Sequence, residues 1–428
     1  MVVRTVEGKT VHALKVGDIK VRNLQWAGDD YLIVLSSVTR PGGLYIPGEW
    51  NASELYSAAV VNLKSKTAFV VFFHSRDVYP VVFDTAGYRQ VDGRWYGYFS
   101  GATILDNTFS KSYGNIGVIS LYQVDLETGD YRRAGEGSRT WLMNSDGTPL
   151  VHASIRRDKG MVQWRLYEGR SERDLIDKQE TPLGGIDLAG LGRTADTYLI
   201  QSELAPNVGL WEHSMTPGQA PVNLTSASIV SLLQDSSGLA IGAKLEGDIP
   251  QTLLFDPARK ASFEAVKQAF APANVELLSF DTSGKRMTVL ATSPTDSGTY
   301  FMVDLSHQNV EKLGSAYPGV QGDAIGAVSM VHYKAADVLA LEGVLTLPPG
   351  SAGKNLPLVV LPHGGPEARD HLGFDWTAQA FAGRGYAVFQ PNFRGSGGFG
   401  TVFRDAGFGE WGRKMQTDIS DGVAELAR

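Results

Sequence analysis

Residues 356–366 read LPLVVLPHGGP, an apolar run that ends in a His-Gly-Gly-Pro turn. A continuous apolar run of this kind is typical of a strand buried on both faces of a mostly parallel sheet. Two glycines directly after such a strand predict a tight turn whose backbone N–H groups stay accessible. This stretch therefore predicts an α/β region and marks a place where a carbonyl oxygen can be polarised.

The segments around this stretch alternate between strand-like and helix-like patterns. Gly383 ends the first helical pattern, and Ile419, Val423 and Leu426 share one face of the second. Alternating strands and helices predict an α/β domain over residues 326–428. Its predicted strands are 328–334, 341–347, 356–361 and 386–389, and its predicted helices are 376–382 and 418–428.

Residues 20–320 show almost no helical periodicity and consist of short apolar runs separated by Gly, Asp, Ser and Pro. A turn leading into an apolar strand recurs at roughly 40–60 residue spacing, as expected for propeller blades. The repeats of this turn are 28–34, 92–96, 145–148, 195–199, 235–239 and 281–285. A second pattern, a strand ending in apolar-Asp/Asn-apolar, occurs at 61–64, 124–129, 255–257 and 303–305. We interpret it as a hairpin in which the Asp or Asn side chain accepts from turn amides.

The two alternating patterns predict a β-propeller over residues 1–325, with about six recognisable blades. The alternatives are a β-sandwich or two unrelated β-domains, but neither needs the same turn-strand-hairpin pattern six times. The predicted fold is thus an all-β propeller followed by a partial α/β-hydrolase domain with a mostly parallel, incomplete sheet.

Composition limits the classes of function. A chain of 428 residues is too long for one ordinary hydrophobic core, so two domains are expected. Its net charge of -7 argues against a nucleic-acid partner. The absence of cysteine excludes disulfides, zinc-thiolate sites and cysteine nucleophiles. No His/Asp/Glu cluster has the spacing of metal ligands, so we expect neither a metal nor an organic cofactor.

No stretch reaches the roughly 20 apolar residues that span a bilayer, so we expect no membrane partner. The N-terminus lacks the apolar run of a signal peptide. This favours a cytoplasmic location for the sequence as it stands, with a periplasmic or secreted location if a leader is missing. The oligomeric state stays open, with a homo-oligomer among the alternatives.

Three motifs of the second region resemble the prolyl oligopeptidase family of serine peptidases, in its acylaminoacyl-peptidase and dipeptidyl-aminopeptidase-like branches. They are LPHGGP at 361–366, QPNFRGSGGFG at 390–400, and FGEWG at 408–412 with Asp418 and Asp421 after it. The resemblance covers about the last 100 residues; the predicted propeller supports it through architecture rather than sequence.

The resemblance implies roles for several residues of these motifs. Gly364 and Gly365 are the candidates for an oxyanion hole, with Gly365 preferred, because such a site needs free backbone N–H donors. His363, Pro366, Arg394, Gly395 and Ser396 are candidates for the active-site wall. Arg394 either forms an ion pair that fixes its loop or touches a substrate carbonyl. Trp411 is expected to pack the following helix against the sheet, and Asp418 and Asp421 to cap or anchor that helix.

Catalysis in this family needs Gly-x-Ser-x-Gly, followed by Asp and His. The 428 residues contain no Gly-x-Ser-x-Gly, so we assign no nucleophile, acid or base. We expect a fragment that stops before the catalytic serine and is inactive alone.

The favoured function is a serine peptidase that cleaves short oligopeptides through an acyl-enzyme in the full-length parent. Acylaminoacyl, dipeptidyl and endopeptidase specificities are not separated, although the lack of a Glu-Glu pair disfavours one dipeptidyl mode. The alternatives are a non-catalytic propeller that binds a partner and an esterase of the same hydrolase fold.

Overall fold

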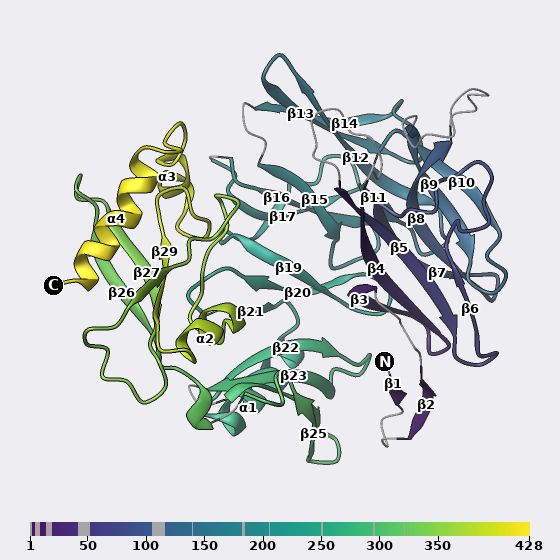
Figure 1. Ribbon diagram of the computed structural model, residues 1–428. Coiled ribbons are helices and arrows are strands. Elements are labelled where there is room, and N and C mark those ends of the chain that lie inside the picture. Colours follow the sequence, from purple (N-terminus) through teal and green to yellow (C-terminus); the bar gives the residue numbers. More distant parts are fainter. Residues whose placement is uncertain are drawn as a thin grey trace. The chain divides into compact units, whose positions relative to one another are not determined.

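The computed structural model shows a chain built mainly from β-sheets (Figure 1). It describes residues 2–4, 9–13, 19–41, 52–104, 116–138, 140–181, 185–204, 206–249, 251–293, 296–320 and 322–428. The chain divides into two compact units. The first comprises residues 1–200, 213–219 and 236–239, and the second comprises residues 201–212, 220–235 and 240–428.

Six sheets follow one another in the described part of the chain between residues 20 and 315, and strands pair in chain order within each. Pairing is antiparallel, for example between β4 and β5 and between β12 and β13. Four sheets are β3 (Lys20–Ala27), β4 (Tyr31–Pro41), β5 (Ala52–Asn62), β6 (Thr67–Val70); β7 (Asp84–Val91), β8 (Arg94–Ile104), β9 (Ile116–Asp125), β10 (Tyr131–Glu136); β11 (Thr140–Met143), β12 (Pro149–Asp158), β13 (Met161–Glu168), β14 (Leu175–Thr181); and β15 (Ile186–Leu191), β16 (Thr197–Ser202), β17 (Gly209–Ser214), β18 (Val222–Thr225). The others are β19 (Ile229–Gln234), β20 (Ala240–Leu245), β21 (Gln251–Leu254); and β22 (Asn274–Phe280), β23 (Arg286–Ser293), β24 (Asp296–Asp304), β25 (Asn309–Ser315).

Successive antiparallel sheets, five of four strands and one of three, make this region propeller-like, as the repeats predict. Within each of these sheets every strand pairs with the strand before it in the chain, so no long connections are needed inside a sheet. A separate short pair, β1 (Val2–Arg4) with β2 (Thr10–Ala13), precedes them.

The Asp/Asn hairpin pattern forms as predicted at three of its four positions. Asn62 accepts from the amides of residues 64 and 65, Asp125 from those of 127 and 128, and Asp304 from those of 306 and 307. In each case a side-chain oxygen takes up amides that the hairpin leaves unpaired. The pattern therefore marks real turns between neighbouring strands.

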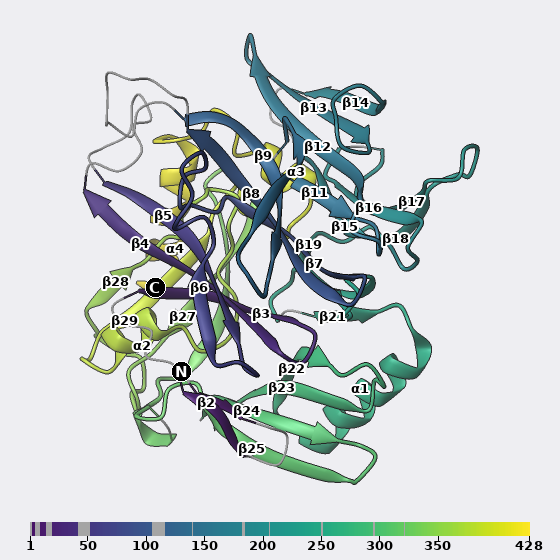
Figure 2. The same ribbon diagram turned by 90° about the vertical axis from the view of Figure 1, so that its right-hand side faces the viewer.

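The fourth position starts a helix instead, so its interpretation as a hairpin was wrong. Asp256 accepts from the Arg259 amide at 2.7 Å and caps α1 (Pro257–Phe270), which lies beside β21 and β22 (Figure 2). Proline at the first helical position lacks the N–H that a helix start leaves unpaired anyway. The helix buries Phe263 and Val266.

A mixed sheet follows, with the order β26 (Val328–Lys334), β27 (Ala340–Thr346), β29 (Ala387–Asn392), β28 (Leu358–Val360). The β26–β27 and β27–β29 pairs are antiparallel and the β28–β29 pair is parallel. The sheet is thus mixed in the described residues, rather than mostly parallel. Strand β28 is half-buried at the sheet edge instead of being covered on both faces. A chain that joins two parallel strands needs a crossover, which α2 (Trp376–Ala382) provides here.

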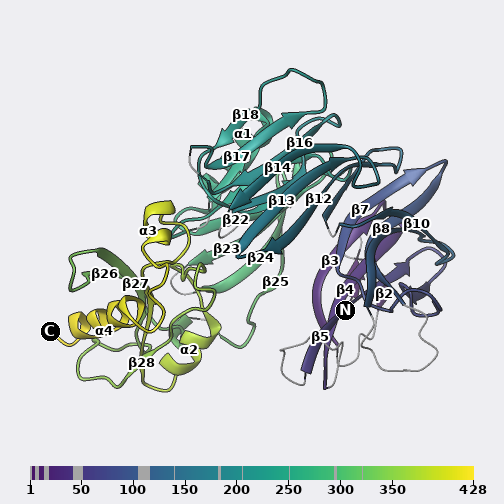
Figure 3. The same cartoon turned by 90° about the horizontal axis from the view of Figure 1, so that it is seen from above.

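The helix α4 (Lys414–Leu426) packs against β26, β27 and β29. Figure 3 shows α4 alongside β26 and β27. The helix starts four residues before the predicted helix; α3 (Thr401–Asp405), which the sequence did not predict, precedes it. The buried Phe389 ring fills the space that side chains at Gly343 and Gly422 would need. Small residues on the strand and the helix thereby allow the two to approach closely. The boundary between residues 325 and 326 stays a prediction.

Candidate active site

The candidate residues lie on the two loops that follow the parallel strands. Residues 361–375 leave the carboxyl end of β28, and residues 393–400 leave the carboxyl end of β29. Since neighbouring parallel strands end at the same edge of a sheet, both loops lie there. In α/β sheets this edge is the usual place for a ligand site.

The His-Gly-Gly turn leaves its backbone amides exposed. Gly364 and Gly365 are both solvent-accessible, and among the described residues neither amide donates a hydrogen bond to another part of the chain. Gly365 has φ +119°, and a Cβ there would lie 2.8 Å from the amide nitrogens of Glu367 and Ala368. A side chain at 365 would thus force the turn to move. The geometry is that of an unsatisfied donor pair held by a turn that requires glycine.

These glycines line a pocket of about 360 Å³ with a mostly apolar wall. Trp411 lines the same pocket and is 73% exposed. It therefore borders the pocket rather than packing α4 against the sheet. The interpretation of Trp411 as a packing residue was therefore wrong. The pocket is lined by Pro362, His363, Gly364, Gly365, Pro366, Phe393, Trp411, Gly412, Met415, Gln416 and Ile419.

His363 joins the two loops. Its Nε2 lies 2.9 Å from Ser396 Oγ, and its ring stacks on Phe393 with centroids 4.6 Å apart. Burial lowers the pKa of His363, which favours the neutral ring. Ser396 is fully buried, and its hydroxyl donates to the Phe393 carbonyl at 2.6 Å. The His363–Ser396 contact is therefore a buried link between loops rather than a pair open to substrate.

Arg394 is buried and is bound by two carboxylates. Its guanidinium binds Asp418 at 2.7 and 2.8 Å and Asp337 with two bonds of 2.9 Å. Asp418 is fully buried and also accepts from the Arg394 amide. Hydrogen bonds from Arg394 and Lys414 hold the pKa of Asp337 well below its usual range. Bidentate pairing of this kind fixes both position and orientation.

The loop around Arg394 packs with almost no space for side chains. A Cβ on Gly395, which has φ +95°, would lie 2.7 Å from Met415 Cε. The Gly397 amide donates to the Ala368 carbonyl at 3.1 Å, so one loop is hydrogen-bonded to the other. The second loop thus supports the first.

The predicted residues separate into two groups. His363, Gly364, Gly365 and Pro366 line the pocket, whereas Arg394, Gly395 and Ser396 are not among its lining residues. The sequence analysis missed Asp337, which is 57 positions from Arg394 and carries no local signal. Asp418 and Asp421 do not cap α4 but anchor it: Asp418 through Arg394, and Asp421 by accepting from the Ala336 amide at 2.8 Å.

Within the described ranges, no three His, Asp or Glu side chains gather in a way that would hold a metal ion. None of the helices described is long and apolar enough to cross a bilayer.

Comparison with known proteins shows which protein family this chain resembles. Residues 372–428 match the model of the prolyl oligopeptidase family. The chain is 38% identical over 324 residues to dipeptidyl aminopeptidase BIII of Pseudoxanthomonas mexicana, an alignment that covers 71% of this chain and 46% of that protein. The chain thus spans about half the length of this relative.

Solved structures agree at the level of the fold. A puromycin-hydrolyzing peptidase of Mycobacterium tuberculosis has a TM-score of 0.60 at 15% identity, covering 96% of this chain and 71% of that one. Prolyl oligopeptidase B of Galerina marginata has a TM-score of 0.61 at 10% identity, covering 95% of this chain and 58% of that one. These two likenesses show the fold alone. Through the family model that matches residues 372–428 and the alignment with the Pseudoxanthomonas protein, the chain is similar to members of the prolyl oligopeptidase family.

Proposed function

We propose that this chain supplies the propeller and the oxyanion-binding side of the active site of a serine-type peptidase that hydrolyses short peptides through an acyl-enzyme. Residues 326–428 are then the first part of an α/β-hydrolase domain. The propeller restricts access, so that oligopeptides enter and folded proteins do not.

The exposed amides of Gly364 and Gly365 carry this proposal. They border a pocket at the carboxyl ends of β28 and β29, which is where acyl-transfer enzymes of α/β type place an oxyanion hole. Preorganised N–H donors stabilise the negative oxygen of a tetrahedral intermediate by about 3–4 kcal/mol each. We assign this role first to Gly365, because its turn is the more constrained of the two.

The proposal assigns nucleophile, acid and base to none of these 428 residues, since the sequence has no Gly-x-Ser-x-Gly. Ser396 lies within hydrogen-bond distance of His363, but it is fully buried and bonded to a carbonyl. A nucleophile needs access to the substrate carbonyl. The 428 residues alone are therefore expected to hydrolyse no peptide.

The test compares the 428-residue chain with the protein isolated from its natural source. Both are treated with a biotinylated fluorophosphonate, weighed intact, and assayed on N-terminally free and N-acylated peptide amides. We expect one adduct and peptide hydrolysis for a natural protein heavier than 46.2 kDa, and neither for the isolated chain. An adduct on Ser396 of the chain, or a natural protein of 46.2 kDa without adduct, would overturn the proposal.

A further inference from the structure

The loop that carries the His-Gly-Gly turn continues onto the propeller-like sheet β19–β21. His371 Nδ1 lies 2.7 Å from the carbonyl oxygen of Gly247, and the Leu372 amide donates to the carbonyl of Asp248 at 3.0 Å. Gly247 and Asp248 belong to the connection between β20 and β21, and all four residues lie in the second compact unit. The loop after β28 is therefore hydrogen-bonded to a sheet of the propeller-like region.

Arg369 connects this contact to the rest of the second unit. Its side chain is only 4% exposed, and its guanidinium binds Asp248 as well as Glu342 of β27, the latter at 3.0 Å. The same guanidinium donates to the Gly398 carbonyl at 3.2 Å and lies 3.9 Å from the centre of the Phe399 ring. Charged hydrogen bonds and a cation–π contact together fix the position of an arginine. One side chain thus links the β20–β21 connection, strand β27 and the loop after β29.

The two carboxylates around Arg369 depend on its charge. Burial and the nearby Asp248 raise the pKa of Glu342, whereas Arg369 lowers it. Without the guanidinium that both bind, the carboxylates of Asp248 and Glu342 would repel each other. The β20–β21 connection therefore stays close to β27 because Arg369 neutralises both groups.

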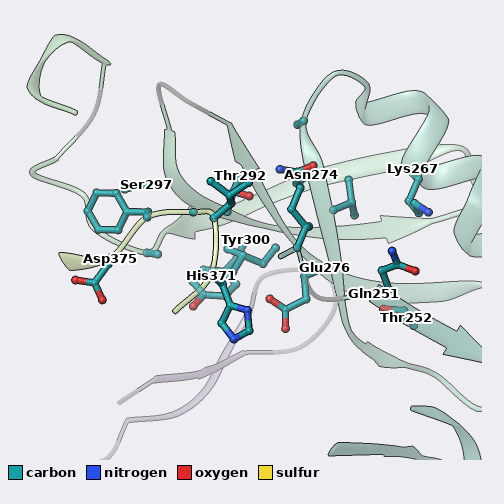
Figure 4. A pocket seen from close by; sticks show the side chains of 18 of the residues that line it. Gln251, Thr252, Lys267, Asn274, Glu276, Thr292, Ser297, Tyr300, His371 and Asp375 are labelled. Carbon is teal, nitrogen blue, oxygen red and sulfur yellow. The ribbon is translucent and has the colours of Figure 1, made fainter. Parts of the chain in front are cut away.

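A second, larger pocket leaves this loop without packing on one side. The pocket has a volume of about 970 Å³ and is lined by residues 369–375 and by the sheet β22–β25 (Figure 4). Figure 4 shows His371 and Asp375 on the loop and Tyr300 on the sheet. Since segments with few packing contacts open easily, the polar contacts to the β20–β21 connection supply support that packing does not.

The His-Gly-Gly turn lies shortly before Arg369 in the chain. A Cβ on Gly365 would lie 2.8 Å from the amide nitrogens of Glu367 and Ala368, so the turn folds back on these two residues. The Ala368 carbonyl in turn accepts from the Gly397 amide at 3.1 Å. The position of the turn thus depends on the residues between it and Arg369.

We propose that Arg369 is a positioning residue for the oxyanion hole. Through Asp248 and Glu342 it holds the amides of the His-Gly-Gly turn in place and makes their position depend on the β20–β21 connection. Arg369 touches no reacting atom and acts through the backbone of its loop. The catalytic part of this inference rests on the proposed peptidase function. The propeller-like region then contributes to the chemistry as well as to access.

Hydrogen–deuterium exchange of the 428-residue chain, measured by mass spectrometry, tests the anchoring without any assay of activity. Asp248→Ala removes one carboxylate from Arg369 but keeps the backbone carbonyl that Leu372 binds. We expect residues 367–375 to exchange about fivefold faster in this variant, since a charged hydrogen bond no longer opposes opening of the loop. Strand β27 and helix α4 should exchange at the wild-type rate.

Glu264→Ala is the matched control. Glu264 borders the same larger pocket and pairs with Lys267 at 3.2 Å, and its side chain is 46% exposed, against 49% for Asp248. The control removes the same charge from α1 instead of the β20–β21 connection, so exchange of residues 367–375 should stay within about twofold of the wild type. Arg369 itself is left unchanged, because its loss would leave a buried carboxylate unpaired and destabilise the fold.

Kinetics of the natural protein test the catalytic part. Per fluorophosphonate-reactive site, Asp248→Ala should lower kcat for a peptide amide about tenfold and leave KM within about twofold. A displaced oxyanion donor weakens binding of the transition state rather than of the substrate. Asp248→Glu keeps the charge and should recover most of the lost kcat. Counting reactive sites removes the contribution of unfolded protein, so a merely structural role would leave kcat unchanged.

Unchanged exchange in Asp248→Ala would overturn the anchoring, and faster exchange with unchanged kcat would overturn the positioning role. Equal losses of kcat in Asp248→Ala and Asp248→Glu would also overturn it, because the charge would then not matter. A natural protein that hydrolyses no peptide overturns the peptidase proposal and, with it, the catalytic part of this inference. The exchange experiment decides the anchoring in either case.

Discussion

The two loops that follow β28 and β29 are both rich in glycine, yet they are built differently. In the first, Gly364 and Gly365 are exposed, and their amides are not used by the described chain. In the second, Arg394 and Ser396 are buried and fully engaged with neighbouring groups. The first loop borders a pocket, and the second holds that loop in place through the bond from the Gly397 amide.

Glycine content alone therefore does not identify a reactive loop. What separates the two is the state of the backbone amides and of the polar side chains around them. A free donor at a pocket can serve a ligand, whereas a satisfied donor in a buried network serves stability. Substitutions in the second loop should accordingly damage folding, and substitutions in the first should damage chemistry.

The largest expected effect is on the stability of the second loop. Arg394→Ala leaves the fully buried Asp418 without its cation. Breaking a buried pair in this way costs about 3–5 kcal/mol of unfolding free energy. Urea denaturation of the chain measures it, with Arg428→Ala as the control, because the Arg428–Glu425 pair is exposed and is worth under about 1 kcal/mol. Equal losses in the two variants would remove the distinction between the loops.

Gly365→Ala tests the first loop. The new Cβ would meet the amide nitrogens of Glu367 and Ala368, so the turn and its N–H must move. If the natural protein is the proposed peptidase, its kcat/KM should fall by about 100-fold or more in this variant, as for the loss of one oxyanion donor. Gly364→Ala, whose Cβ meets no atom within 4 Å, serves as the control for folding. Unchanged kcat/KM in Gly365→Ala would contradict the assigned role.

The dependence of the unfolding free energy on pH tests whether Asp337 stabilises the Arg394 network. The folded state lowers the pKa of Asp337, so this carboxylate stabilises the fold above its unfolded pKa of about 3.9. The contribution is lost as the pH falls through the lower, folded value. The stability difference between wild type and Asp337→Asn should therefore be larger at pH 7 than at pH 3, by urea denaturation at each pH. A stability difference that is the same at pH 7 and pH 3 would mean that the Asp337–Arg394 ion pair does not stabilise the fold.

The smallest effect is expected at the pocket wall. Trp411→Ala removes a side chain that is 73% exposed and should change the unfolding free energy by less than about 0.5 kcal/mol. Phe393→Ala, the other aromatic residue of the same pocket, removes a buried ring and should cost about 3–5 kcal/mol. Similar losses in a thermal or urea experiment would show that Trp411 is a packing residue after all.

The sequence predicts what depends on local pattern. The apolar run before His363, the turn at Gly364 and the helix that ends at Gly383 are all marked by neighbouring residues, and the structure has them. The Asp/Asn hairpins are predictable for the same reason, because the side chain bonds amides only two or three positions away.

Two kinds of feature were not predicted from the sequence. The partners of Arg394 lie 24 and 57 positions away, and only the folded sheet brings them together. The helix α1 was missed because Asp256 looks like a hairpin residue, although Asp before Pro257 is also a helix-start signal. The buried Phe263 and Val266, three positions apart, would have separated the two interpretations.

The most direct test of the central claim is a crystal structure of the natural protein phosphonylated at its reactive serine by a peptide phosphonate. The account predicts that the phosphonyl oxygen accepts from the Gly365 or Gly364 amide at about 2.7–3.1 Å. A phosphonyl oxygen that points away from this turn, with the Gly364 and Gly365 amides still unbonded, would contradict it.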